Sequence, residues 1–155
     1  MELTFAPKDF LQIDNARITH RNFRGEGSMY NREGDRNFSL VIEDQELAEA
    51  LIERGWNVKI KPPREEGDTP FMFLPIKVSF NERGPAVYLK TGNAVNKLDE
   101  DSLGVLDEID ILAVDLDIRP YDWGPINGKY GRSAYLQSIH VTQRITDRFA
   151  ARYND

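Results

Sequence analysis

Arginines, asparagines and aromatic residues lie close together in two stretches of the sequence, residues 17–38 and 121–132. Aromatic rings stack on unpaired bases, and arginine or lysine neutralises phosphates, so this combination is typical of proteins that bind single-stranded nucleic acid. Glycines in the segment 24–35 allow a backbone to approach a ligand closely. The candidate DNA-binding residues are Arg17, Arg21, Arg24, Tyr30, Arg32, Arg36, Tyr121, Trp123, Lys129, Tyr130 and Arg132.

Ordinary packing is the alternative interpretation of the same residues. Phe38 alternates with Leu40 and Ile42, a pattern that favours a core position for its ring. The arginines could equally lie on a solvated face. The aromatic residues of the expected loops are better binding candidates, because their sequence neighbours offer no apolar partners.

A catalytic centre is not evident. His20 and His140 belong to separate strands and lack metal-ligand spacing, and Ser28 lies outside a Gly-x-Ser-x-Gly motif because position 30 is tyrosine. No phosphate-binding loop or dinucleotide motif is present. We therefore expect no enzymatic activity, no catalytic residue and no cofactor.

Asp115 and Asp117 share one face of an expected strand and follow six further acids between residues 99 and 110. A hard cation binds such carboxylates, so a metal-dependent enzyme is one alternative. A solvated outer face is the other, and we assign no metal ligand. If the chain binds DNA, we expect the acidic segment 99–117 to lie away from the binding groove.

Charge is unevenly distributed in a chain with a net charge of −6 and a pI near 5.0. Residues 17–36 contain five arginines and three acids, whereas residues 97–117 contain one lysine and eight acids. A local basic groove can attract a polyanion to an acidic protein, because fields act locally. Cysteine is absent, which excludes disulfides and thiolate metal sites. With no signal-like or membrane-spanning segment evident, we expect a cytoplasmic location and no membrane partner.

Alternation of apolar and polar residues predicts a mainly β fold. Asp44 and Gly55 bound one clear helix at 44–54. The segments 71–80 and 86–91 are expected to form a hairpin, Asn127-Gly128 marks a second hairpin, and the glycine-rich loop 24–35 is expected to become ordered on a ligand. Short additional helices are expected at 99–107 and 147–153. The other expected strands are 10–23, 36–42, 56–61, 111–119 and 132–143.

The segment Ala16–Phe38 resembles small phage and prophage proteins, some of them described as single-stranded DNA-binding proteins of the OB-fold type. Ile118–Tyr121, Asn127–Lys129 and Ala134–Leu136 are similar too, and the resemblance extends from about residue 13 to 141. It implies an OB-fold-like small β-barrel, flanked by binding loops at 24–35 and 121–131. Two expected features depart from that pattern. The strands number more than the five of an OB-fold, and the helix at 44–54 follows the second strand rather than the third.

These observations together predict one domain, residues 1–155, with residues 1–9 and 144–155 peripheral. The predicted function is non-catalytic binding of single-stranded DNA in phage replication or recombination, in the cytoplasm of the bacterial host that the resemblance implies. Phage replication or recombination proteins and a second copy of the chain are the further partners considered. A small β-rich phage structural protein that binds no nucleic acid remains the alternative.

Overall fold

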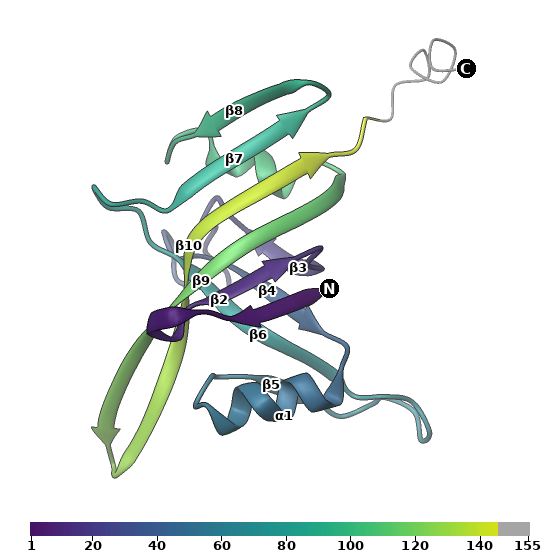
Figure 1. The fold of residues 1–155 in the computed structure, drawn as a ribbon, viewed down its shortest axis with the longest axis vertical. Coiled ribbons are helices and arrows are strands. Elements are labelled where there is room, and N and C mark those ends of the chain that lie inside the picture. The colour runs from purple at the N-terminus through teal and green to yellow at the C-terminus, as the bar shows by residue number, and fades with distance from the viewer. Residues whose placement is uncertain (146–155) are drawn as a thin grey trace.

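The computed structural model describes residues 1–145, which form a strand-rich fold with one α-helix (Figure 1). The mainly β prediction is confirmed, whereas the helix expected at 147–153 lies outside the described residues. Two short 3-10 helices are η1 (Pro7–Asp9) and η2 (Leu103–Asp107). The other elements are β1 (Glu2–Phe5), β2 (Leu11–Asp14), β3 (Ile18–Asn22), β4 (Arg36–Ile42), α1 (Gln45–Glu53), β5 (Lys59–Lys61), β6 (Phe71–Val78), β7 (Ala86–Thr91), β8 (Ala94–Leu98), β9 (Ile111–Ile126) and β10 (Lys129–Gln143).

The strands form one sheet whose main path runs β1-β2-β9-β10-β6-β4-β3, with β5 paired to β6 and the β7–β8 hairpin paired to β10. The β6–β10 and β7–β10 pairings are parallel and the other pairings are antiparallel. The long β9–β10 hairpin projects at one end of the structure, and β7–β8 lies at the other end (Figure 1).

A bend at residues 15–17 divides the strand that we expected to be continuous over 10–23. Asn15 has a φ of 52°, which turns the chain between β2 and β3. Ala16 N donates to Val114 O of β9 at 2.8 Å, and Val41 N of β4 donates to Arg17 O at 2.9 Å. Residues 16 and 17 therefore bond to β9 on one side and to β4 on the other, and the sheet curls around one core. Within residues 1–145, no ladder joins β3 directly to β9.

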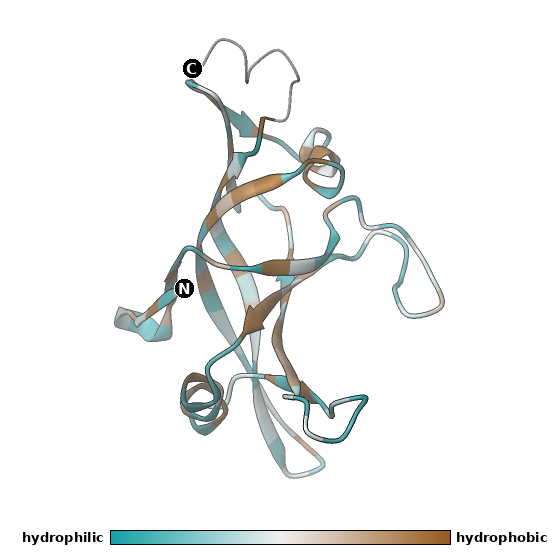
Figure 2. Ribbon diagram, turned by 90° about the vertical axis from the view of Figure 1, so that its right-hand side faces the viewer, coloured by the Kyte–Doolittle hydropathy of each residue, from teal (hydrophilic) through white to brown (hydrophobic). Residues whose placement is uncertain are grey.

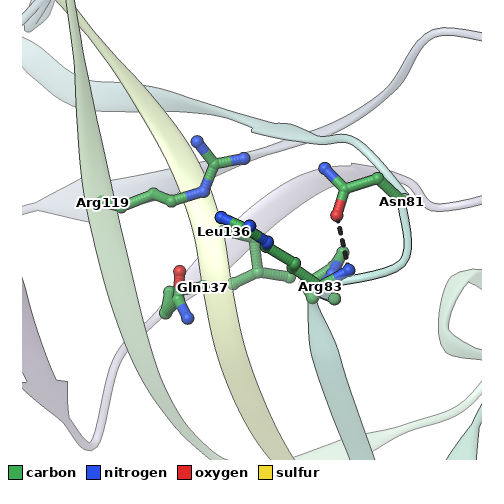
Figure 3. A pocket seen from close by; sticks show the side chains of 7 residues that line it. Asn81, Arg83, Arg119, Leu136 and Gln137 are labelled. Atoms are coloured by element: carbon green, nitrogen blue, oxygen red, sulfur yellow. Dashed lines mark hydrogen bonds between the residues drawn. The ribbon is translucent and has the colours of Figure 1, made fainter.

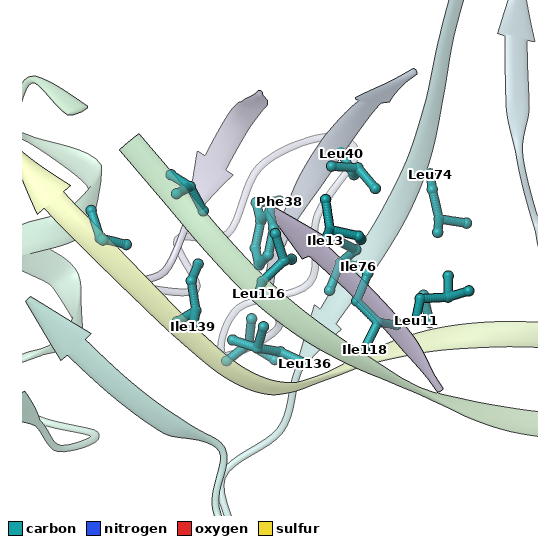
Figure 4. Close-up of a cluster of buried hydrophobic side chains, with 14 of the residues drawn as sticks. Leu11, Ile13, Phe38, Leu40, Leu74, Ile76, Leu116, Ile118, Leu136 and Ile139 are labelled. Carbon is teal, nitrogen blue, oxygen red and sulfur yellow. The ribbon is translucent and has the colours of Figure 1, made fainter. Parts of the chain in front are cut away.

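Alternate residues of the curled sheet fill the core. The inward positions of β6 are Met72, Leu74, Ile76 and Val78, all buried. Phe38 is buried as the alternation of β4 predicted, and its ring stacks on that of Phe23 with 5.0 Å between centroids. Figure 4 shows side chains from β2, β4, β6, β9 and β10 converging on this core. Figure 2 shows that hydrophobic residues concentrate on the strands and hydrophilic ones along the loops.

The hairpin expected between residues 71–80 and 86–91 is wrong. β6 and β7 each pair in parallel with β10, β6 at residues 134–135 and β7 at residues 138–142. Val87 and Leu89 thereby pack beside Ile139 and Val141 in the core, which a β6–β7 pairing would not achieve. β8 was not expected, because its residues are mostly exposed and show no apolar alternation.

The predictions of a helix at 44–54 and of a turn at Asn127-Gly128 are confirmed. Asp44 caps α1 by accepting a hydrogen bond from Glu46 N at 2.9 Å, and Gly55 follows the helix with a φ of 92°. Asn127 and Gly128 both have positive φ and join β9 to β10, whose arms are longer than expected. None of the helices within residues 1–145 has the length and apolar character needed to cross a membrane.

Candidate nucleic-acid interface

Cross-strand register places a row of polar and aromatic side chains on the outer face of the sheet. Asn37, Lys77, Tyr135 and Arg119 are successive register partners across β4, β6, β10 and β9. These four side chains point outward, because they alternate with buried residues of the same strands, namely Phe38, Ile76, Val78, Ile118, Ala134 and Leu136. We call them the outer row.

Tyr135 is the centre of the outer row. The Cζ atom of Arg119 lies 4.9 Å from the Tyr135 ring centroid, and the Nζ atom of Lys77 lies 5.8 Å from it. The Tyr121 ring meets the Tyr135 ring edge-on, with 5.9 Å between their centroids, and Tyr121 is 56% exposed. Among residues 1–145, neither Lys77 nor Arg119 forms an ion pair. Both cations are therefore available to an anion.

A second aromatic group occupies the same face of the sheet. The rings of Phe71 and Phe73 stack with 5.3 Å between centroids. The centroid of the His20 ring lies 6.3 Å from the centroid of each. Lys61 lies 5.6 Å above the Phe73 ring, and Lys59 is the register partner of Phe73. We call His20, Phe71 and Phe73 the aromatic patch. Phe71, Phe73 and Lys77 occupy alternate positions of β6, so the patch and the outer row share one face.

The loop 24–35 borders this face and is ordered by its own side chains. Asn31 donates to the carbonyl oxygens of Glu26 and Asp35 at 2.8 and 3.0 Å, and Asn37 donates to Asn31 Oδ1 at 2.8 Å. The two ends of the loop approach each other closely at Gly25 and Gly34. A Cβ at Gly25 would lie 2.9 Å from the Gly34 carbonyl carbon, so this approach requires glycine at position 25. These contacts hold the loop in the structure, and its ordering on a ligand stays a prediction. Tyr30, 94% exposed, and Arg32 extend from the loop.

Most of the arginines predicted from the sequence are engaged within the chain. Arg17 pairs with Glu43 at 2.7 Å and Arg36 with Glu100 at 2.9 Å. Arg24 pairs with Glu108, whose hydrogen bond raises the pKa of the guanidinium.

The guanidinium of Arg21 is partly buried and donates to the carbonyl oxygens of Leu106 and Ile109 at 2.7 and 2.8 Å. Arg21 therefore joins β3 to η2, and its guanidinium stabilises the fold. The acidic segment was expected to lie away from the binding groove, but it supplies the carboxylate partners of Arg24 and Arg36, two of the arginines predicted to line that groove. The packing of η2 against β3 brings the two segments together.

The hairpin arm holds the remaining candidates. Arg132 pairs with Asp122 at 2.6 Å and with Asp9 at 3.3 Å, and its hydrogen bond holds the pKa of Asp122 below its ordinary value. Trp123 packs on Gly131, where a Cβ would lie 2.1 Å from the ring atom Cζ2. Lys129 and Tyr130 are exposed near the turn. Tyr121 alone of this group reaches the outer row.

The carboxylates of Asp115 and Asp117 have protein donors. Asn15 N donates to Asp115 at 2.9 Å, and the Ser138 hydroxyl donates to Asp117 at 3.3 Å. Over the residues that the structure describes, no group of three or more His, Asp or Glu side chains is arranged to hold a metal ion.

Sequence reasoning missed most of the outer face. The residues 71–78 form a nearly continuous apolar run, so the pattern alone does not show which side of β6 is buried. Lys77 and Arg119 carry no motif of their own. The residues missed are His20, Lys59, Lys61, Phe71, Phe73, Lys77, Arg119 and Tyr135.

Comparison with known proteins identifies the family. The model of the phage ssDNA-binding domain matches residues 2–155. The chain belongs to this family. No curated protein matches the chain.

Solved structures similar to this phage ssDNA-binding domain include the single-stranded DNA-binding protein from bacteriophage Enc34. The full protein shares 12% identity with a TM-score of 0.54, over 100% of both chains. Its C-terminal truncation shares 14% identity with a TM-score of 0.54, over 94% of this chain and 97% of that one. Its complex with ssDNA shares 16% identity with a TM-score of 0.52, over 94% of this chain and 92% of that one. At these identities the likeness shows a common fold.

The strand order of this phage ssDNA-binding domain is that of an OB-fold when β2 and β3 are counted as one bent first strand. OB-folds bind oligonucleotides on the face of their second and third strands and on two flanking loops. β4 and β6 stand in those two strand positions, with the loop 24–35 before β4 and the turn at 127–128 between the last two strands. The outer row and the aromatic patch therefore lie on the equivalent face.

Proposed function

We propose that this chain binds single-stranded DNA without catalysis, on the outer face of β5, β6, β9 and β10, during phage replication or recombination. The observation that carries the proposal is the placement of Tyr135 between Lys77 and Arg119, two cations without ion-pair partners among residues 1–145. Family membership and the fold shared with a protein solved in complex with ssDNA support it.

Bases stack on the rings of the outer face in this proposal. Phe71 and Phe73 offer one platform and Tyr121 with Tyr135 another, while Tyr30 and Tyr130 extend the surface at its two borders. Each stacked base contributes about 1–3 kcal/mol. A duplex hides its base faces inside the helix, so this surface favours single strands.

Phosphates contact the cations that are free of carboxylate partners. Lys59, Lys61, Lys77 and Arg119 lie beside the platforms, and Arg32 and Lys129 lie on the flanking loop and turn. The other arginines predicted from the sequence have partners within the chain and act by holding its segments in place. Those five residues are Arg17, Arg21, Arg24, Arg36 and Arg132.

Fluorescence anisotropy of a labelled oligo(dT) of about 15 nucleotides tests the proposal, because this length spans the site of one OB-fold. We expect saturable binding at about 50 mM salt that weakens steeply as salt rises. Unlabelled single strands should compete and a duplex of the same length should not. Absence of binding at low salt, or equal competition by duplex, would overturn the proposal.

A further inference from the structure

A hollow of about 370 Å³ lies beside the outer row, between the turn 81–85, β9 and β10. The side chains of Asn81, Arg83, Arg119 and Gln137 line it, together with Gly84 (Figure 3). Arg119 belongs both to this hollow and to the outer row, so the two features are continuous.

The hollow forms where β10 changes its neighbour. β10 pairs with β6 through Tyr135 and with β7 from Ser138 onward, and neither ladder includes Leu136 or Gln137. The β9–β10 register also shifts between Leu136 and Ser138. Bulges of this kind redirect a side chain, and here the bulge places Gln137 at the wall of the hollow.

The chemistry of the wall suits an anion. Arg83 and Arg119 direct their guanidinium groups toward the same space in Figure 3. Asn81 Oδ1 accepts a hydrogen bond from Arg83 N at 2.8 Å, which fixes the turn and leaves the amide NH₂ of Asn81 as a donor. No carboxylate lines the hollow, and among residues 1–145 neither guanidinium has an ion-pair partner.

Two guanidinium groups and the Asn81 amide match the oxygens of a phosphate, to which arginine can donate two parallel hydrogen bonds. We propose that this hollow is a phosphate pocket, in which Arg83 and Arg119 hold one phosphate of the bound strand. The inference rests on the proposed function. Because Arg119 also lies on Tyr135, the pocket sets which base meets the Tyr121–Tyr135 platform and so fixes the register of the strand.

Salt-dependent binding of oligo(dT) to Arg83→Gln tests the pocket. A lost phosphate contact on a single strand reduces the slope of log K against log salt by about 0.7. We expect that reduction for Arg83→Gln and an unchanged slope for Arg64→Gln, an exposed arginine of the loop 62–70 with the same change of charge. Circular dichroism of both variants checks that each is folded.

The outcomes separate the two proposals. If the wild-type chain does not bind oligo(dT), the proposed function fails. If the wild type binds and Arg83→Gln behaves like Arg64→Gln, the pocket is wrong and the proposed function stands.

The phosphate can be an internal phosphodiester or a terminal phosphate. Oligonucleotides with and without a 5′-phosphate distinguish these sources in the wild type and in Arg83→Gln. A terminal phosphate predicts tighter binding of the phosphorylated strand only when Arg83 is present. An internal phosphodiester predicts equal binding of both strands and the same change in slope.

Discussion

Arg119 lies over the ring of Tyr135 with its Cζ atom 4.9 Å from the ring centroid, and the two residues are register partners on β9 and β10. The cation–π contact holds the guanidinium in place without neutralising it, in contrast to the carboxylates that pair with Arg17 and Arg36. A charge held in this way is ordered before a ligand arrives and remains free to contact a phosphate.

Tyr135→Ala removes the centre of the outer row. We expect affinity for oligo(dT) to fall about 5- to 150-fold, which corresponds to the 1–3 kcal/mol of one stacked base. Tyr88→Ala is the matched control, because Tyr88 stacks on His140 at 5.6 Å on β7 and β10, away from the outer row. Equal losses in the two variants would contradict a stacking role for Tyr135.

Phe73 tests whether the aromatic patch binds through its rings. Phe73→Leu keeps an apolar side chain but removes the flat ring, so we expect weaker binding of oligo(dT) with little change in thermal stability. Phe73→Tyr keeps the ring and should bind like the wild type. Anisotropy titrations and melting curves of the three proteins provide the comparison, and wild-type affinity in Phe73→Leu would exclude Phe73 as a platform.

Arg21→Gln should destabilise the fold and leave the electrostatics of binding unchanged. Its guanidinium donates to Leu106 O and Ile109 O, and charged hydrogen bonds of this kind contribute about 1.5–3 kcal/mol to stability. Urea denaturation should show that loss, while the salt slope of binding by the folded variant stays at the wild-type value. A reduced slope with unchanged stability would place Arg21 in contact with DNA instead.

The ion pair between Asp122 and Arg132 gives the hairpin arm a defined pH response. Arg132 lowers the folded-state pKa of Asp122, so the pair stabilises the arm at neutral pH and its contribution disappears as pH falls through that lowered pKa. Solvent screens this exposed carboxylate, which limits the effect to under about 1 kcal/mol.

Urea denaturation of the wild type and of Asp122→Asn at pH 7 and at about pH 2 measures this contribution. We expect the wild type to be more stable at pH 7 and the difference to disappear at the acidic end. A stability difference that grew on acidification would contradict the sign of the pKa change.

Local patterns predicted many of the elements of the fold, because each of these depends on neighbouring residues. The alternation of Phe38, Leu40 and Ile42, the Asp44 cap and the Asn127-Gly128 turn all appear in the structure as expected. Strand partners depend on the whole core. The choice of β10 rather than β6 as the neighbour of β7 could not be inferred from residues 71–91 alone.

The site shows the same division between local and distant determinants. Arg24 and Arg36 looked available in the sequence, but their partners Glu108 and Glu100 lie 84 and 64 residues further along the chain. Conversely, Lys77, Arg119 and Tyr135 lie far apart in sequence and become neighbours only through the pairing of β6, β9 and β10. Local composition therefore indicated the kind of ligand, whereas the sheet determined which side chains are placed to meet it.

The salt dependence of oligo(dT) binding by two double variants tests most directly whether the outer face binds the strand. Lys77→Gln/Arg119→Gln removes two cations without ion-pair partners among residues 1–145, and Arg17→Gln/Arg24→Gln removes two cations already paired with carboxylates. We predict that the first variant reduces the slope by about 1.4, the value for two phosphate contacts on a single strand, and that the second leaves it unchanged. An unchanged slope in the first variant with a reduced slope in the second would contradict binding on the outer face.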